Sequence, residues 1–252
     1  MKQLTRSVTT SLCAVVWLLA VVTPAQGQRA PYDLEKFRSV LDDSKLQAPT
    51  SSPTKIDRGD FAGASNEYFF LDKTGRFMTF TVQGEGNRSE LRQSTGDWDT
   101  ATETPQYLTA RVRVLVPEDR GLEQFTFLQI HDKKNDNEGL NKPLLRVTRH
   151  GRYRGTNDHL WAHIRTPKNF NQPISLSNLG TKNIDLGPRP KGFFNAQVRV
   201  QNSRMIVAID GQTKVDMDVS YWNGLENYYK AGVYNQDAGR SKVEFEVLRY
   251  SE

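Results

Sequence analysis

The segment that decides the fold reads Tyr228-Tyr229-Lys230-Ala231-Gly232-Val233-Tyr234-Asn235-Gln236. Polar side chains recur in it at every second position, and Arg88-Ser89-Glu90-Leu91-Arg92 and Gln129-Ile130-His131 repeat that spacing. Successive side chains of a β-strand point to opposite faces, so each segment predicts a strand with one polar face and one mostly apolar face. Together they predict a sheet that carries cations, an imidazole, a carboxamide and a phenol on one side. Such a face suits a groove that grips an anionic, hydroxyl-rich chain.

Alternating segments elsewhere extend the prediction of β-structure along the chain. They cover residues 77–82, 108–115, 125–130, 196–200 and 243–247. Asp210-Gly211, typical of tight hairpin turns, separates two further strand segments at 205–209 and 214–217. Many strands with few helices predict an all-β fold, and we expect an antiparallel two-sheet β-jelly roll with a concave substrate groove.

Two polar loops and a histidine pair are further candidates for the surroundings of this groove. Residues 133–141 and 166–186 are longer than hairpins need, so they are expected to form walls or lids. His159 and His163 have the spacing of a helical metal pair, but no HExxH glutamate follows His159. We therefore predict no metal site, and a place in the groove lining or on the surface for both histidines.

The first 27 residues predict a signal peptide. An apolar run over residues 12–22 follows Lys2 and Arg6, is short for a membrane span, and precedes small residues at 25 and 27. We expect a secreted or periplasmic protein without membrane association after cleavage; an uncleaved anchor is the alternative. The single cysteine, Cys13, lies inside this segment, so the mature chain can form no disulfide.

The mature chain divides into a lead-in over residues 28–56 and one large domain over residues 57–252. Apolar residues at 34, 37, 40 and 41 predict a short helix in the lead-in. The whole chain has 34 Lys and Arg against 29 Asp and Glu, without a long basic run, so nucleic acid is not indicated as a partner. Cations on the polar strand faces favour a localised acidic ligand instead, and we expect a monomer.

The three opening segments, taken in order, resemble the signature of the alginate lyases of polysaccharide lyase family 7. That signature is R-[ST]-E-[LV]-R, then Q-[IV]-H, then Y-F-K-A-G-x-Y-N-Q, and the chain has Tyr229 where the family usually has Phe. The resemblance covers residues 55–252, approximately. It implies a β-jelly roll and metal-independent β-elimination on a 1,4-linked uronate polymer such as alginate, with no cofactor.

By position, the resemblance implies two sets of site residues. The catalytic set is Arg88, Gln129, His131 and Tyr234. The substrate-binding set is Glu90, Arg92, Tyr228, Lys230, Asn235 and Gln236. Glu90 is expected to hold its neighbouring arginines rather than to touch substrate.

Each residue type of the catalytic set suits a step of β-elimination. Elimination removes the C5 proton of a uronate, which adds negative charge beside an ionised carboxylate, and Arg88, Gln129 and His131 can hold that charge. Tyr234 can donate a proton to the leaving oxygen. Either Tyr234 or His131, whose unperturbed pKa is about 6.5, can take the C5 proton, depending on whether mannuronate or guluronate is bound. The Q-I-H variant of the family favours guluronate-containing blocks.

Other classes of protein fit parts of the pattern. A retaining glycoside hydrolase needs a close pair of carboxylates, typically as E-x-D-x-x-E, and the chain has no such string. A non-catalytic uronan-binding module would not need His131 and Tyr234 together. A lyase of another polyuronate, such as glucuronan, stays open because it shares the C5 chemistry. Taken alone, Arg88, Glu90 and Arg92 would also fit a solvated salt-bridge ladder.

Overall fold

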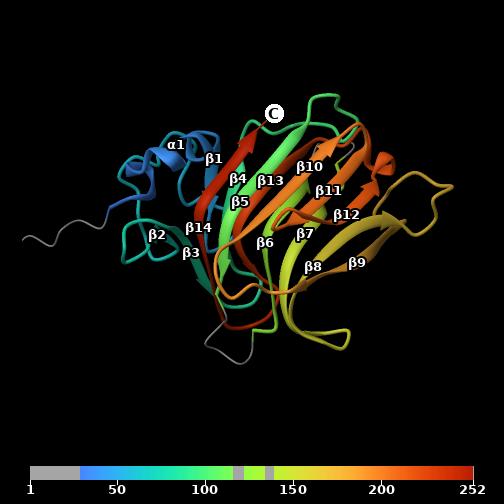
Figure 1. The fold of residues 1–252 in the computed structure, drawn as a ribbon. Coiled ribbons are helices and arrows are strands. Elements are labelled where there is room, and N and C mark those ends of the chain that lie inside the picture. Colours follow the sequence, from blue (N-terminus) through green and yellow to red (C-terminus); the bar gives the residue numbers. More distant parts are fainter. Residues whose placement is uncertain (1–28, 116–121, 134–138, 252) are drawn as a thin grey trace, which may run out of the picture.

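The computed structural model describes residues 29–115, 122–133 and 139–251, so the predicted signal peptide at 1–27 lies outside the described residues. Two antiparallel seven-stranded sheets pack face to face (Figure 1). The groove sheet consists, in spatial order, of β1 (Ser44–Gln47), β4 (Arg88–Gln93), β13 (Asn227–Asn235), β6 (Gln124–Asp132), β7 (Pro143–Tyr153), β8 (Thr156–Pro167) and β9 (Leu179–Pro188). The outer sheet consists of β12 (Gln212–Asp218), β11 (Arg204–Ile209), β10 (Phe194–Gln201), β5 (Gln106–Val114), β14 (Arg240–Ser251), β3 (Met78–Gln83) and β2 (Phe69–Leu71). The predicted all-β two-sheet jelly roll is confirmed.

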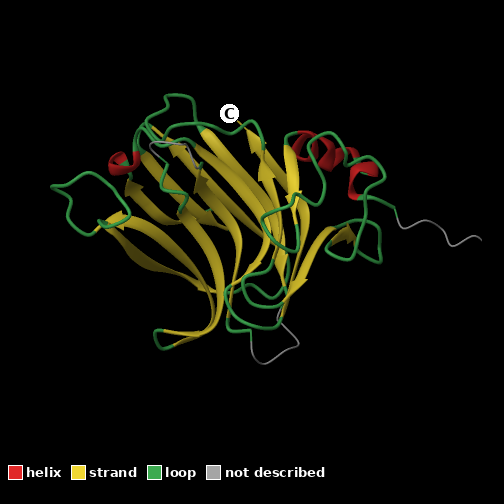
Figure 2. Cartoon of the chain, turned by 180° about the vertical axis from the view of Figure 1, so that it is seen from behind, coloured by secondary structure: helices red, strands yellow, loops and turns green. Residues whose placement is uncertain are grey.

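Helices contribute little to the molecule. The described helices are η1 (Pro31–Asp33), α1 (Glu35–Asp42) and η2 (Ser220–Trp222). Figure 2 shows them at the two ends of the sandwich, outside the curved sheets. No helix in the described part of the chain is long and apolar enough to cross a membrane.

The core lies between the two sheets and explains the alternation in the sequence. From the outer sheet, Leu108 and Val112 of β5 are fully buried in it. From the groove sheet, Leu91, Ile130 and Val233 enter the same core. Each such side chain contributes about 1.5–3 kcal/mol by leaving water. These core residues alternate with a second set whose side chains therefore project from the opposite face, away from the outer sheet, namely Arg88, Glu90, Arg92, Gln129, His131, Lys230 and Tyr234.

The predicted strands and the hairpin are present. All five alternating segments overlap with strands, and β11 and β12 form the hairpin around Asp210-Gly211. Asp210 and Gly211 have φ values of 47° and 76°, as a type I′ turn requires. Alternation did not predict β7 or β8, because both are buried on two faces over much of their length.

One loop prediction is wrong in part. Residues 179–186 of the expected loop 166–186 belong to β9, a largely polar edge strand, and residues 168–178 form the connection from β8. The connection extends from the end of the sandwich opposite α1 (Figure 1). Of the other predicted loop, residues 134–138 lie outside the described residues.

The lead-in is part of the sandwich rather than a separate segment. The predicted helix is present as α1, and its Phe37 and Leu41 are buried in the common core. Strand β1 pairs with β4, which places Leu46 opposite Leu91. The boundary drawn at residue 57 therefore divides one continuous fold, since the groove sheet already begins at Ser44.

Candidate active site

Strand register brings the three signature segments together. Strand β13 lies between β4 and β6, so that Lys230 pairs with Arg92 on one side and with Gln129 on the other. On the same strand, Tyr234 pairs with Arg88. Directly opposed residues of neighbouring strands have Cβ atoms about 4.5–5.5 Å apart, so residues distant in the sequence become side-chain neighbours.

A buried carboxylate organises the floor of the site. Glu90 is fully buried and accepts hydrogen bonds from Lys230 Nζ at 2.8 Å, from Gln129 Nε2, and from Arg88 Nη1 at 3.4 Å. Burial lowers the pKa of Lys230, and the Glu90 carboxylate opposes that shift. Ionised groups persist in such a position only when they are paired. The expected pairing of Glu90 with a neighbouring arginine is therefore present for Arg88.

Gly232 makes this close arrangement possible. It has a φ of 145° and pairs with Glu90. A Cβ atom at position 232 would lie 2.1 Å from the carbonyl oxygen of Ser89. Only a residue without a side chain lets β13 approach β4 so closely at this point.

Two arginines stack on two tyrosines above the floor. The Arg88 Cζ atom lies 4.2 Å from the centroid of the Tyr234 ring, and Arg92 Cζ lies 4.1 Å from that of Tyr228. Cation–π contacts of this kind are favourable and orient the planar guanidinium group. Arg92 is therefore held by Tyr228 rather than by Glu90.

His131 is held in its neutral form. Burial, and then the positive charge of Lys230, lower its pKa to about 3. Its Nδ1 atom lies 2.7 Å from the carbonyl oxygen of Asp132, which can only accept, so Nδ1 carries the proton. Its ring stacks on Tyr228 with centroids 5.4 Å apart. At neutral pH the Nε2 atom therefore has a free lone pair for a proton.

The members of the predicted catalytic set line one cavity of about 230 Å³. Its lining is Arg88, Gln129, His131, Asn141, Lys142, Pro143, Arg146, Arg165 and Tyr234. Sequence reasoning did not identify Arg146 or Arg165. The sequence does contain a pattern that points to Arg146, because Arg146, Thr148 and His150 recur at every second position as in the signature segments. Two consecutive leucines, Leu144 and Leu145, precede them and interrupt the two-residue alternation of a strand.

Two predicted substrate contacts have other partners. Asn235 is fully buried; its amide donates to the carbonyl oxygens of Gly84 and Gly239 and accepts from Ser241, so the structure does not bring it into the groove. It follows Tyr234 directly and so points to the other face of β13. Gln236 donates to the Tyr234 carbonyl oxygen at 2.9 Å, which steadies the end of the strand.

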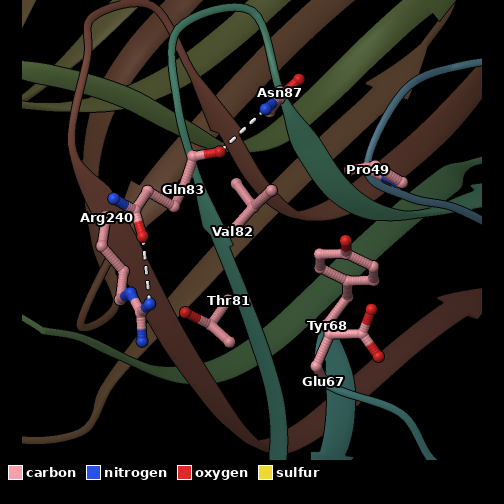
Figure 3. Close-up of a pocket in the computed structure, with 8 residues that line it drawn as sticks. All are labelled: Pro49, Glu67, Tyr68, Thr81, Val82, Gln83, Asn87 and Arg240. Atoms are coloured by element: carbon pink, nitrogen blue, oxygen red, sulfur yellow. Dashed lines mark hydrogen bonds between the residues drawn. The ribbon is translucent and has the colours of Figure 1, made fainter.

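A larger depression lies at the edge formed by β2 and β3 (Figure 3). It measures about 350 Å³, and Figure 3 shows Arg240 and Asn87 turned toward Gln83. Its lining contains no member of the predicted catalytic set. Convergent polar groups, rather than volume, identify the candidate site.

The histidines of β8 lie on the polar face of the groove sheet. His163 Nε2 lies 2.8 Å from His150 Nε2, and His163 Nδ1 lies 2.6 Å from Asn183 Oδ1. His159 pairs with Asp185 at 2.9 Å. Within the described ranges, no group of three or more His, Cys, Asp or Glu side chains could hold a metal ion.

Comparison with known proteins agrees with this geometry. The alginate lyase family model matches residues 40–252. An alginate lyase of Photobacterium sp. (strain ATCC 43367) is 30% identical over 251 residues, covering 87% of each chain. The structure of alginate lyase AlyC3 matches with a TM-score of 0.79 at 28% identity, covering 89% of this chain and 96% of that one. Alginate lyase A1-II', a member of polysaccharide lyase family 7, shares the fold with a TM-score of 0.65 at 22% identity, over 86% of this chain and 97% of its own. The chain belongs to the alginate lyase family.

Proposed function

We propose that this protein cleaves alginate by β-elimination, with Arg88, Gln129, His131 and Tyr234 as its catalytic residues. The observation that carries the proposal is the convergence of these four side chains, from three strands, on one cavity above a buried carboxylate. The family match independently supports the same activity.

Arg88 neutralises the uronate carboxylate, and Gln129 donates a hydrogen bond to it. Glu90 takes one N–H donor from each of them, and a guanidinium has five donors while a carboxamide has two. The remaining donors are free for the substrate and are already oriented. Preorganised donors aimed at developing negative charge are usually the largest catalytic contribution, because they need no reorganisation during the reaction.

Tyr234 and His131 transfer the protons. The C5–H bond breaks, its electron pair forms the C4–C5 double bond, and the C4–O bond to the next sugar breaks as that oxygen gains a proton. Tyr234 donates this last proton. For one C5 epimer Tyr234, once deprotonated, takes the C5 proton and passes it to the leaving oxygen. For the other epimer the base is His131, which is neutral at pH 7 and can accept, while Tyr234 donates its own proton.

Four polymers test the proposal directly. The purified protein is incubated with alginate, polymannuronate, polyguluronate and glucuronan while the near-UV absorbance of the new double bond is followed. Alginate products should carry unsaturated non-reducing ends by mass spectrometry. Saturated products alone would indicate hydrolysis. Cleavage of glucuronan but not of alginate would reassign the substrate, and binding without cleavage would indicate a uronan-binding module.

We propose guluronate-containing blocks as the favoured substrate, on the strength of the Q-I-H segment. A related structure, AlyC3 at 27% identity over 89% of this chain, was determined with dimannuronate bound. Initial rates on the two homopolymers decide between the epimers. A higher kcat/KM on polymannuronate would contradict the guluronate preference.

We also propose that the reaction needs no metal and takes place outside the cytoplasm. Arg88 and Gln129 supply charge neutralisation themselves, so activity should survive exhaustive chelation. Loss of activity on chelation, restored by one added metal ion, would refute this. Export predicts a mature N-terminus near residue 28, which N-terminal sequencing of the protein from medium or periplasm would show.

A further inference from the structure

We propose that Arg146, with Arg165 beside it, binds the carboxylate of a second uronate, adjacent to the one that is cleaved. The inference rests on the proposed function and extends it from one uronate to two neighbouring ones. It makes Arg146 a residue that selects a continuous polyuronate.

The placement of Arg146 extends the site across the groove sheet. Arg146 on β7 pairs with Gln129 on β6 and with His163 on β8. Arg165 lies two residues after His163 on β8, so it projects from the same face. Both arginines line the cavity that contains Arg88 and Tyr234.

Arg146 lacks a partner for its charge. Among the residues that the structure describes, no hydrogen bond or ion pair is found for it, and its side chain is only partly exposed to water. Burial lowers its pKa, the nearby charge of Arg165 lowers it further, and Tyr234 and Glu90 oppose the shift without forming a hydrogen bond to Arg146. Two other buried arginines, Arg149 and Arg189, instead share Asp158 at 3.0 and 2.8 Å. A desolvated cation is costly unless an anion pairs with it, so an unpaired one in a groove marks a place for an anionic ligand.

The positive charges of the groove outnumber the negative charges that Glu90 and one uronate carboxylate would supply. Glu90 is already bonded to Lys230 and Arg88. Arg165 donates to the hydroxyl of Thr181 at 2.7 Å, which supplies no negative charge. A single uronate carboxylate held by Arg88 and Gln129 would leave Arg146 and Arg165 uncompensated. Arg146 lies one strand beyond Gln129, roughly 4.8 Å across the sheet, so it can meet a carboxylate other than the one held by Arg88 and Gln129.

The test compares the unsubstituted protein and two variants of Arg146 on two substrates. The substrates are a defined oligouronate and the same oligouronate with the carboxylate next to the cleaved residue converted to a methyl ester. The unsubstituted protein should show a roughly ten- to hundredfold higher KM for the ester, with kcat changed much less. Arg146→Gln should show that high KM for both substrates, and Arg146→Lys should recover part of the difference.

A matched control and a stability measurement separate this role from a structural one. Arg152→Gln removes a charge from the same strand, but the side chain of Arg152 is 81% exposed, so its KM values should equal those of the unsubstituted protein. Arg146→Gln should leave Tm unchanged or raise it, because it removes an unpaired desolvated cation beside Arg165. A structural arginine would give a lower Tm.

Three results would overturn the inference. One is an Arg146→Gln variant that still discriminates between the two substrates as the unsubstituted protein does. Another is a fall in kcat with KM unchanged, which would place Arg146 on the cleaved uronate itself. The third is a clear drop in Tm together with unchanged KM. Absence of cleavage of any polyuronate by the unsubstituted protein would instead remove the proposed function, and this inference with it.

Discussion

Lys230 Nζ lies 2.8 Å from Glu90 Oε2, and the two side chains are 3% and 0% exposed. The pair joins β13 to β4 and forms the floor of the groove. The interpretation of residues 88–92 as a solvated salt-bridge ladder is therefore wrong for Glu90. A solvated pair would contribute little, whereas this pair is strongly interdependent because neither charge reaches water.

Removing one partner of this pair should destabilise the protein strongly. Glu90→Gln leaves the Lys230 charge buried without compensation, and we expect a loss of about 3–5 kcal/mol in the free energy of unfolding, measured in urea. Adding Lys230→Met should recover most of this loss without restoring activity, since Arg88 and Gln129 lose their anchor. Asp216→Asn, which breaks an exposed ion pair with Arg204, is the control and should change little. Equal effects of Glu90→Gln and Asp216→Asn would contradict the proposed floor.

Gly232 should not tolerate a side chain. In Gly232→Ala, the new carbon would lie 2.1 Å from the Ser89 carbonyl oxygen and 2.7 Å from the Glu90 Cα, and backbone atoms cannot move aside cheaply. We expect a loss of about 1–3 kcal/mol or more, visible as a lower Tm, together with lower activity. Gly192→Ala is the matched control, because a Cβ atom there meets nothing within 4 Å. A normal Tm for Gly232→Ala would show that β13 and β4 are not so close.

Tyr234 should carry more of the chemistry than Arg92. Tyr234→Phe removes one hydroxyl and keeps the ring on which Arg88 stacks, so stability and KM should change little while kcat falls by ~10²–10⁴-fold. Arg92→Ala should mainly raise KM, since Arg92 stacks on Tyr228 at the side of the site. Steady-state kinetics on alginate measures both. A near-normal kcat for Tyr234→Phe on every polyuronate would mean that another group donates the proton.

Acid should destabilise the fold through three histidines. Burial is the main cause that lowers the pKa values of His131 and His150 to about 3 and that of His163 to about 4, whereas unfolded histidine titrates near 6.5. Between these values the unfolded chain binds more protons, so stability is complete above pH 6.5 and falls as pH drops toward 3–4. At pH 5 each histidine that stays neutral in the fold costs about 2 kcal/mol of stability.

Urea unfolding at pH 7.5 and pH 5 measures this loss. The His163→Gln variant removes one of the three groups and should show a shallower dependence on pH than the unsubstituted protein. Its stability should therefore decline less between the two pH values. A denaturation midpoint that does not change from pH 7.5 to pH 5 would show that these histidines are protonated in the fold.

Local patterns in the sequence determined the fold class and the polar face of the site. The two-residue period of a strand is a local property, so alternation located β5, β10 and β14 and showed which side chains of residues 88–92 share a face. Asp210-Gly211 likewise determines its turn through its own backbone preferences. The sequence also identified Arg88, Gln129, His131 and Tyr234, which line one cavity in the structure.

The features of the site that depend on strand register and burial became visible only in the tertiary structure. Pairing of β7 with β6 brings Arg146 beside Gln129, and no local period specifies which strands pair. Placement on the inner face turns Asn235 into a support of the fold, although it lies between Tyr234 and Gln236 in the signature. The low pKa of His131 arises from desolvation and from the charge of Lys230, a residue 99 positions away in the chain. Burial and electrostatic contacts of this kind depend on residues that are close in space but distant in the sequence, and these residues meet only when the two sheets pack together.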